Sequence, residues 1–305
     1  PSNIAIDTHL NATVADASGL RGKAAGDALQ KGAVWGQVLG THASLQSSSA
    51  GDGFTSSAFG ILVGVDAFVA DDAAAGLAFN WLRNTAKGKD DASGNSTVTD
   101  TYQLSLYGSW RPAGQPAWVQ GLVAVGLNQY DQQRDIDYLG ESATADYWGL
   151  QAQAKLSAGY DVAVDGGLTV TPLGSLLLMR THNRAYSEIG SSVNQAVESQ
   201  DINTVESIVG ARLTKTVDTG LGALTAEVQV GWLHDFISSP ISTVATLAGV
   251  GYAVDTARLP RDGAQLGIAA TLQQSDDLAL RLEYQGDLRD GYASHTALLK
   301  ARQSF

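Results

Sequence analysis

The sequence predicts an all-β protein, a 12-stranded antiparallel transmembrane β-barrel with an N-terminal α-helix in the lumen. Three observations lead to this fold class. Segments that alternate apolar and polar residues recur from Ala33 onward, as in strands with two different faces. Tight turns and long polar stretches alternate between these segments, which is the rule for outer-membrane barrels. Aromatic residues on the apolar faces gather near strand ends, where membrane interfaces would lie.

Composition argues against several classes of protein. The net charge of -12 argues against a nucleic-acid partner, which would need clustered Lys and Arg. No apolar run approaches the roughly 18 residues of a membrane-spanning helix. A mean hydropathy of -0.04 is compatible with strands that hide every second residue. The absence of cysteine suits a chain that crosses an oxidising periplasm. No signal peptide opens the sequence, so an exported protein would be a mature or excised fragment.

No cofactor, no metal and no independent enzyme activity are expected. The five histidines show no metal-ligand spacing. The sequence has no G-x-S-x-G nucleophile motif, and Gly249-Val250-Gly251 lacks the rest of a dinucleotide-binding fingerprint.

Residues 1–32 differ from the rest and form the first of two expected regions, a linker and pore helix ahead of a barrel domain at 33–305. From Val14 to Gln30 the segment is rich in Ala and Gly and has no broad apolar stripe. Each glycine costs a helix about 1 kcal/mol against Ala, so such a helix is marginal alone. A disordered linker is the alternative. The preferred interpretation is a thin helix held inside a polar channel.

The strand pattern occupies the remaining chain. Twelve strands are expected, at 33–45, 57–70, 73–86, 98–111, 116–130, 144–164, 168–186, 202–217, 221–236, 262–273, 277–287 and 295–305. Strands about 4.8 Å apart and tilted near 40° then give a backbone radius of roughly 12 Å. Side chains would leave a lumen about as wide as one helix, roughly 10 to 12 Å.

The connections separate two ends of the barrel. Tight turns are expected at 71–72, 112–115, 165–167, 218–220 and 274–276, and long loops at 46–56, 88–97, 131–143, 187–201 and 237–261. Short periplasmic turns and long outer loops are typical of outer-membrane barrels. An even number of strands would return Phe305 to the end where Ala33 starts.

Outward aromatic residues sort into two girdles by this assignment. Those near the long loops are Trp81, Tyr102, Trp148, Trp232 and Tyr284, and those near the short turns are Trp110, Tyr160 and Phe305. Trp148 and Tyr160 are twelve positions apart on one strand, or roughly 30 Å along the barrel axis, close to the apolar band of a membrane. Aromatic residues scattered over a protein surface would not sort in this way.

The end of the chain carries a resemblance to a known family. His295 to Phe305 form a two-faced strand that ends on an aromatic residue, which would be an aggregation hazard as a free edge and is useful when paired with the first strand. Leu278 to Tyr292 (LALRLEYQGDLRDGY) lead into it. This end resembles the translocator domain of classical autotransporters (type V secretion), and the resemblance covers nearly the whole chain.

The resemblance implies a protein of the bacterial outer membrane that delivers an N-terminal passenger to the cell surface. Its partners would be outer-membrane lipid, its own passenger, formerly attached before Pro1, and the barrel-assembly machinery, which reads C-terminal ends such as Phe305. A monomer is expected. A porin-like channel, a barrel enzyme and a soluble β-rich binding module remain as alternatives.

The lumen is expected to carry many charges. By strand parity the inward residues include Asp66, Asp161, Glu206, Glu227, Asp235, Glu283, Asp287, Lys155, Arg212, Arg281, Lys300 and Arg302. One interpretation is a solvated pore lining with internal ion pairs. The other follows from the family, some of whose members cut their own linker at an Asn. Asn11-Ala12 is the candidate bond, with Asp66, Glu206 and Glu227 as candidate bases.

Overall fold

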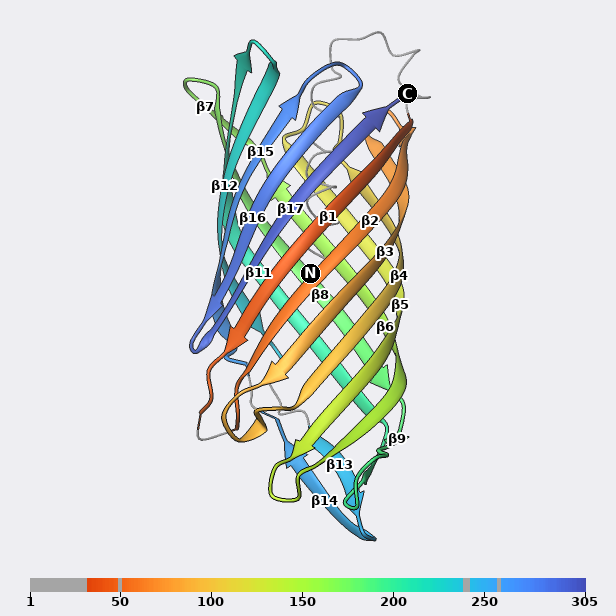
Figure 1. The fold of residues 1–305 in the computed structure, drawn as a ribbon. Helices are drawn as coiled ribbons and strands as arrows, with labels where there is room; N and C mark the ends of the chain where they lie inside the picture. The colour runs from red at the N-terminus through yellow and green to blue at the C-terminus, as the bar shows by residue number, and fades with distance from the viewer. Residues whose placement is uncertain (1–31, 49–50, 238–241, 257–258) are drawn as a thin grey trace.

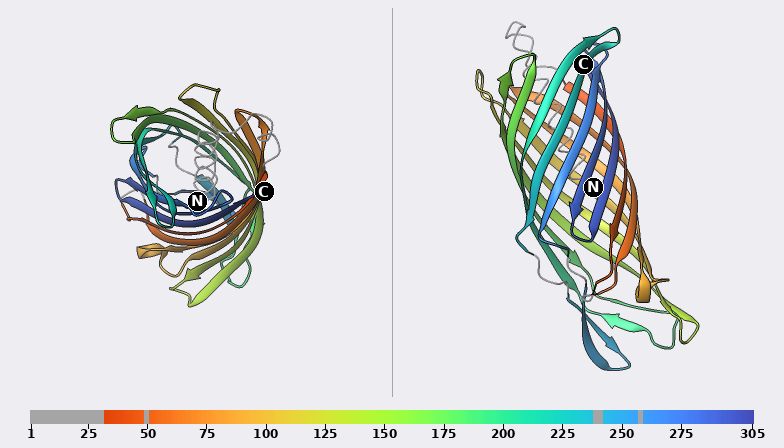
Figure 2. Two further views of the ribbon diagram at one scale, coloured as in Figure 1. Left: turned by 90° about the horizontal axis from the view of Figure 1, so that it is seen from above. Right: turned by 90° about the vertical axis from the view of Figure 1, so that its left-hand side faces the viewer.

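The computed structural model describes residues 32–48, 51–237, 242–256 and 259–305. Thirteen strands form one closed antiparallel sheet (Figures 1 and 2). One of them, β7 (Val162–Val164), only continues β6 beyond Asp161, so the barrel has twelve strands. They are β1 (Gly32–Leu45), β2 (Phe54–Ala70), β3 (Ala73–Gly88), β4 (Ser96–Trp110), β5 (Ala117–Ile136), β6 (Glu141–Tyr160), β8 (Leu168–Asn183), β11 (Gln200–Thr219), β12 (Gly222–Asp235), β15 (Asp262–Gln273), β16 (Leu278–Arg289) and β17 (Tyr292–Ser304). The predicted 12-stranded barrel is confirmed.

The barrel closes between its first and last strands. β17 pairs with β1 along the whole length of both strands, from Ala33 opposite Ser304 to Leu45 opposite Tyr292. The hydroxyls of Thr41 and Thr296 lie 2.9 Å apart across this seam. At its end the backbone N–H of Phe305 donates to the carbonyl of Gly32 at 2.9 Å. Closure leaves no open sheet edge, as a membrane requires.

The two ends of the barrel differ as expected. We call the end with β2–β3, β4–β5, β11–β12 and β15–β16 connections the short-turn rim, at the top of Figure 1, and the other end the long-loop rim. The expected loop at 131–143 was wrong, because β5 and β6 continue as a hairpin to Ile136 and Glu141. Polar residues there can face water on both sides, so the apolar pattern stops while the strand pairing goes on.

A second sheet extends from the long-loop rim. It contains β9 (Tyr186–Ser187), β10 (Gln195–Val197), β13 (Ser242–Leu247) and β14 (Val250–Asp255) in the order β14-β13-β10-β9. The expected loops at 187–201 and 237–261 were therefore wrong in part. These strands are too short to show an alternation in the sequence, and they pair across long distances in the chain, such as Val197 with Ala245.

The two barrel faces have opposite chemistry. The outward face is apolar, with Leu282 61% exposed and Trp148 and Tyr160 about half exposed. The expected aromatic girdles are thus on the outer surface. The inward face holds a buried cluster made of Trp35, Leu39, Leu62, Ala78, Leu82, Tyr107, Leu122 and Leu298. Part of the lumen lining is therefore apolar, which the prediction of a polar channel did not include.

Glycines on neighbouring strands make room for the inward aromatic rings. Trp35 lies opposite Gly64 in the β1–β2 register, and a Cβ at Gly64 would lie 2.6 Å from the indole. The Trp35 indole N–H donates to the Tyr107 hydroxyl at 2.7 Å. Tyr107 in turn lies opposite Gly76.

The predicted pore helix lies outside the described residues, except for Gly32, which begins β1. Within the described ranges, no helix has the length and apolar character needed to cross a membrane.

Candidate functional site

The lumen has two different walls. In β1, β3 and β4, three fully described strands, every inward residue is uncharged. The inward faces of β11, β12 and β16 carry ion pairs instead. In the strand order of the closed sheet (Figure 2), β11 and β12 lie across the ring from β3 and β4, while β16 is separated from β1 by β17 alone. A chain in the lumen would therefore meet apolar and amide groups on one side and charges on the other.

The first ion-pair cluster lies in the half of the barrel near the short-turn rim. Arg281 on β16 holds both oxygens of Glu227 on β12, at 2.8 and 2.9 Å. The same guanidinium binds Glu283 at 2.8 Å and donates to the Thr271 hydroxyl at 2.9 Å. Every group in this cluster is largely buried. Arg281 binds both carboxylates directly, and the charge of Arg212 also acts on them.

The second cluster lies near the long-loop rim. Arg289 at the end of β16 binds Glu206 at 2.7 Å and Asp287 at 3.3 Å, and donates to the Pro260 carbonyl at 3.2 Å. The expected strand ended at residue 287, so the sequence did not assign Arg289 to the lumen. If the alternation of inward positions 285 and 287 is continued to 289, it assigns Arg289 to the lumen.

Asp66, on β2, stands apart from both clusters. Its carboxylate lies 3.4 Å from the Arg302 guanidinium and 3.5 Å from the Tyr107 hydroxyl, which donates to it. Both contacts are longer than those of Glu206 and Glu227. Lys300, from the same strand as Arg302, lies over the Trp35 ring at 5.7 Å from its centroid.

The structure does not bring the three candidate carboxylates together. Glu206 and Glu227 belong to adjacent strands, but the partner of Glu206 in the register is Asp235, eight residues from Glu227. Eight residues of strand span about 26 Å. Asp66 and Glu227 lie near the short-turn rim, and Glu206 lies near the long-loop rim. Asn11 lies outside the described residues, so the structure gives no distance from Asn11 to Asp66, Glu206 or Glu227.

A further cluster lies at the short-turn rim. The Asp161 carboxylate, between β6 and β7, accepts from Arg111 at 2.7 Å and from the Thr171 hydroxyl at 2.6 Å. The Trp118 indole N–H also donates to it, at 3.3 Å. Arg212 from β11 lies over the Trp118 ring, 5.6 Å from its centroid. Asp161 thereby ties together three segments of the barrel where β6 ends.

Side-chain amides form a row across the uncharged wall. Gln37, Leu62, Asn80 and Gln103 follow one another in the registers of β1 to β4. The register then runs through Gly126 to Gln151. Because Gly126 has no side chain, the Gln151 amide reaches over it and donates to the Gln103 oxygen at 3.5 Å.

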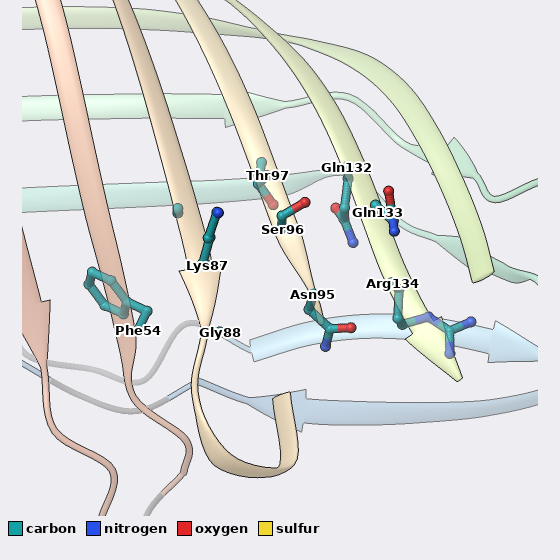
Figure 3. A pocket seen from close by; sticks show the side chains of 10 residues that line it. Phe54, Lys87, Gly88, Asn95, Ser96, Thr97, Gln132, Gln133 and Arg134 are labelled. Atoms are coloured by element: carbon teal, nitrogen blue, oxygen red, sulfur yellow. The ribbon is translucent and has the colours of Figure 1, made fainter. Parts of the chain in front are cut away.

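The long-loop rim carries a small polar cavity. It has a volume of about 140 Å³ and lies between the ends of β2 to β5, lined by Phe54, Ala86, Lys87, Gly88, Asn95, Ser96, Thr97, Gln132, Gln133 and Arg134 (Figure 3). These ten residues include no carboxylate and no histidine, the side chains that general acid-base catalysis most often uses.

Arg134 connects the barrel to the second sheet. Its guanidinium donates to both oxygens of Glu188, at 2.9 and 2.6 Å, and to the Val193 carbonyl at 3.0 Å. The hydrogen bond to Glu188 raises the pKa of Arg134 above its ordinary value. On the next strand, Glu141 accepts from the Ser192 N–H and the hydroxyls of Ser191 and Ser192. These bonds, that of the Ser192 N–H foremost, lower the pKa of Glu141.

Metal ligands do not gather at any of these places. Within the ranges that the structure describes, no group of three His, Cys, Asp or Glu side chains is arranged to hold a metal ion.

Comparison with known proteins gives one family. Residues 34–285 match the family model described as Autotransporter beta-domain. Outer membrane protein B of Rickettsia rickettsii is 25% identical over 283 residues, which are 89% of this chain and 17% of that protein. The chain thus spans about a sixth of the length of this curated relative.

Solved structures share the architecture. The translocator domain of the autotransporter NalP from Neisseria meningitidis aligns with a TM-score of 0.72 and 18% identity, covering 100% of this chain and 98% of that one. The transport unit of the autotransporter AIDA-I from Escherichia coli aligns with a TM-score of 0.63 and 12% identity, covering 97% of this chain and 98% of that one. At such identities these matches establish the fold.

Proposed function

The chain belongs to the autotransporter β-domain family, and from this premise we propose that it delivers an N-terminal passenger across the bacterial outer membrane to the cell surface. The observation that carries this proposal is the closed 12-stranded barrel with a lumen lined on one side by amides and on the other by ion pairs. The family match and the relatives do not favour a porin-like channel, a barrel enzyme or a soluble β-rich module.

The direction of transport follows from the rims. The outer membrane is where this family of barrels resides, and the long-loop rim with its second sheet faces the cell exterior. Both the start of β1 and Phe305 lie at the short-turn rim, which faces the periplasm (Figure 1). A passenger ahead of Pro1 starts from the periplasm and is carried to the outside.

Surface delivery is tested with a reporter. A signal sequence and an epitope-tagged reporter are fused ahead of Pro1, and intact cells are treated with protease. We expect cleavage of the reporter in intact cells, while a periplasmic control protein remains protected. A reporter that is cleaved only after the outer membrane is permeabilised would contradict the proposal.

We further propose two functional regions, a linker and pore helix at 1–32 and the barrel at 33–305. A helix in the lumen would close a channel of about its own width. Deletion of residues 1–32 should leave a folded barrel whose conductance in planar bilayers rises sharply. An intact protein that already conducts as freely would place this segment outside the pore.

Self-cleavage of the Asn11-Ala12 bond is a separate proposal, which we keep with Asp66, Glu206 and Glu227 as candidate bases. Glu206 and Glu227 are held by arginines in short ion pairs, whereas the contacts of Asp66 are longer. A fusion should yield a barrel fragment that begins with Ala12, and Asn11→Asp should block it. An uncut chain on N-terminal sequencing would remove Asn11 from consideration.

Assembly and oligomeric state complete the proposal. Phe305 is 73% exposed, with its backbone paired to Gly32, so the ring is available to the barrel-assembly machinery. Phe305→Ala should lower the yield of folded barrel in cells and leave refolding in detergent unchanged. A monomer is expected by light scattering of the detergent complex.

A further inference from the structure

The row of amides on the uncharged wall suggests a specific role in transport. We define the amide row as Gln37, Asn80, Gln103, Gln151 and Gln153. Neighbouring strands lie about 4.8 Å apart, so Gln37, Asn80, Gln103 and Gln151 are separated by one or two strand spacings along the register. Gln153 lies two residues beyond Gln151 on the same strand, β6. Because barrel strands are tilted, a line of registered residues climbs around the wall and also along the pore axis.

Three members of the amide row have unused hydrogen-bonding groups. Gln37, Asn80 and Gln153 are 2, 1 and 6% exposed. Within the part of the chain that the structure describes, both the oxygen and the nitrogen of each amide lack a hydrogen-bond partner. Buried polar groups are normally paired, and groups that are not paired need a reason. Each of the three amides has one acceptor oxygen and two N–H donors that a chain reaching the row could use.

We propose that the amide row binds the main chain of the passenger in an extended conformation while it passes through the lumen, an inference that rests on the proposed function. An extended main chain carries unpaired N–H and C=O groups, which alternate along both of its sides. Side-chain amides provide the complementary pair of groups at every position. They recognise no particular side chain, so the row accepts a passenger of any sequence.

A helix does not fit this role. The N–H and C=O groups in the interior of a helix bond to each other, so a helix leaves the amides unused. Charged groups would bind the passenger unevenly, because acidic and basic side chains would be held or repelled. Along β1 to β4 the register positions of the amide row hold uncharged residues, Leu62 among them, whereas on the β17 side Lys300 lies opposite Gln37. Water is the competing partner for the amides when no chain is present.

The test replaces the unpaired amides with apolar groups of similar size. The triple variant Gln37→Met/Asn80→Leu/Gln153→Met is compared with the wild type in the reporter fusion, by the rate at which the reporter becomes protease-sensitive on intact cells. A net hydrogen bond corresponds to about a fivefold change in an equilibrium or rate. We expect the variant to deliver the reporter at least fivefold more slowly. The barrel itself should unfold at the same urea concentration as the wild type, or a higher one, because no partner is lost.

The matched control is Gln229→Met/Gln265→Met on the other wall, where the two amides bond each other at 3.2 Å. This control should deliver the reporter at close to the wild-type rate. Equal slowing of both variants, or no slowing of the triple variant while the wild type delivers normally, would overturn the role of the amide row and leave the proposed function standing. A triple variant that unfolds at lower urea would also overturn it. Failure of the wild-type fusion to reach the surface would instead contradict the proposed function.

Discussion

Removal of Arg281 should destabilise the barrel more than any other single charge deletion in the first ion-pair cluster. The Arg281 side chain is 5% exposed and compensates both Glu227 and Glu283, with contacts of 2.8 Å to each. Arg281→Met keeps most of the side-chain volume but removes the cation that binds both buried carboxylates directly, while Arg212 acts on them without a direct ion pair among the described contacts. Breaking one buried pair costs about 3 to 5 kcal/mol. We therefore expect Arg281→Met to lose at least about 3 kcal/mol of the free energy of unfolding.

The assay is equilibrium unfolding in urea of protein folded into lipid vesicles, followed by tryptophan fluorescence. Arg180→Met serves as the control, because the pair of Arg180 with Asp201 is mostly exposed and the midpoint should barely change. The triple variant Arg281→Met/Glu227→Gln/Glu283→Gln should recover much of the lost stability, since the two carboxylate charges are removed together with the arginine that binds them. A loss below about 1 kcal/mol of the free energy of unfolding for Arg281→Met would refute the claim that these ion pairs are buried, because a solvent-exposed ion pair contributes about that much.

Three further predictions concern packing and the long-loop rim. Gly64→Ala should destabilise the barrel by about 1 to 3 kcal/mol in the same assay, because the new Cβ would press on the Trp35 ring; Gly36→Ala, which meets open space, should have little effect, and equal effects would contradict this. Arg134→Met should make residues 189–199 sensitive to proteinase K while the barrel stays resistant, because Glu188 and Val193 lose their donor; unchanged protection would count against this anchor. The lowered pKa of Glu141 means that its bonds to Ser191 and Ser192 are present above the ordinary carboxyl pKa of about 4.3 and are lost as the pH falls through the lower value in the folded protein. The rate of hydrogen exchange at the Ser192 N–H should therefore rise at acid pH in the wild type relative to the rate in Glu141→Gln. A ratio of these two rates that stays constant with pH would contradict the role of Glu141.

The sequence predicted the barrel because its physical requirements are local. A strand with one lipid face and one lumen face must alternate with a period of two, and Leu278, Leu280 and Leu282 do so opposite Arg281 and Glu283. Aromatic rings such as Trp148 and Tyr160 mark the interfaces from their position alone. These signals depend on neighbours a few residues apart, so the twelve barrel strands could be assigned, with errors of up to six residues at their ends.

The partners inside the lumen could not be predicted in this way. Arg281 and Glu227 are 54 residues apart in sequence, and Arg289 and Glu206 are 83 apart. Their contact depends on the register between strands and on tilt, which parity does not give. The amide row could not be predicted for the same reason, because Asn80 and Gln103 become neighbours only through the register of β3 and β4. The second sheet was missed because strands of two to six residues leave no periodic signal.

Passage of the passenger through the lumen is tested most directly by cysteine labelling, since the chain has no cysteine of its own. Gln229→Cys faces the lumen, and Leu104→Cys faces the lipid. Cells carrying the reporter fusion, with the reporter stalled in transit by a folded domain, are treated with a membrane-impermeant maleimide. We expect Gln229→Cys to be labelled in the barrel without residues 1–32, protected in the stalled fusion and labelled again when the stall is released and the passenger cleared, while Leu104→Cys stays unlabelled. Equal labelling of Gln229→Cys in the stalled and empty barrels would contradict transport through the lumen.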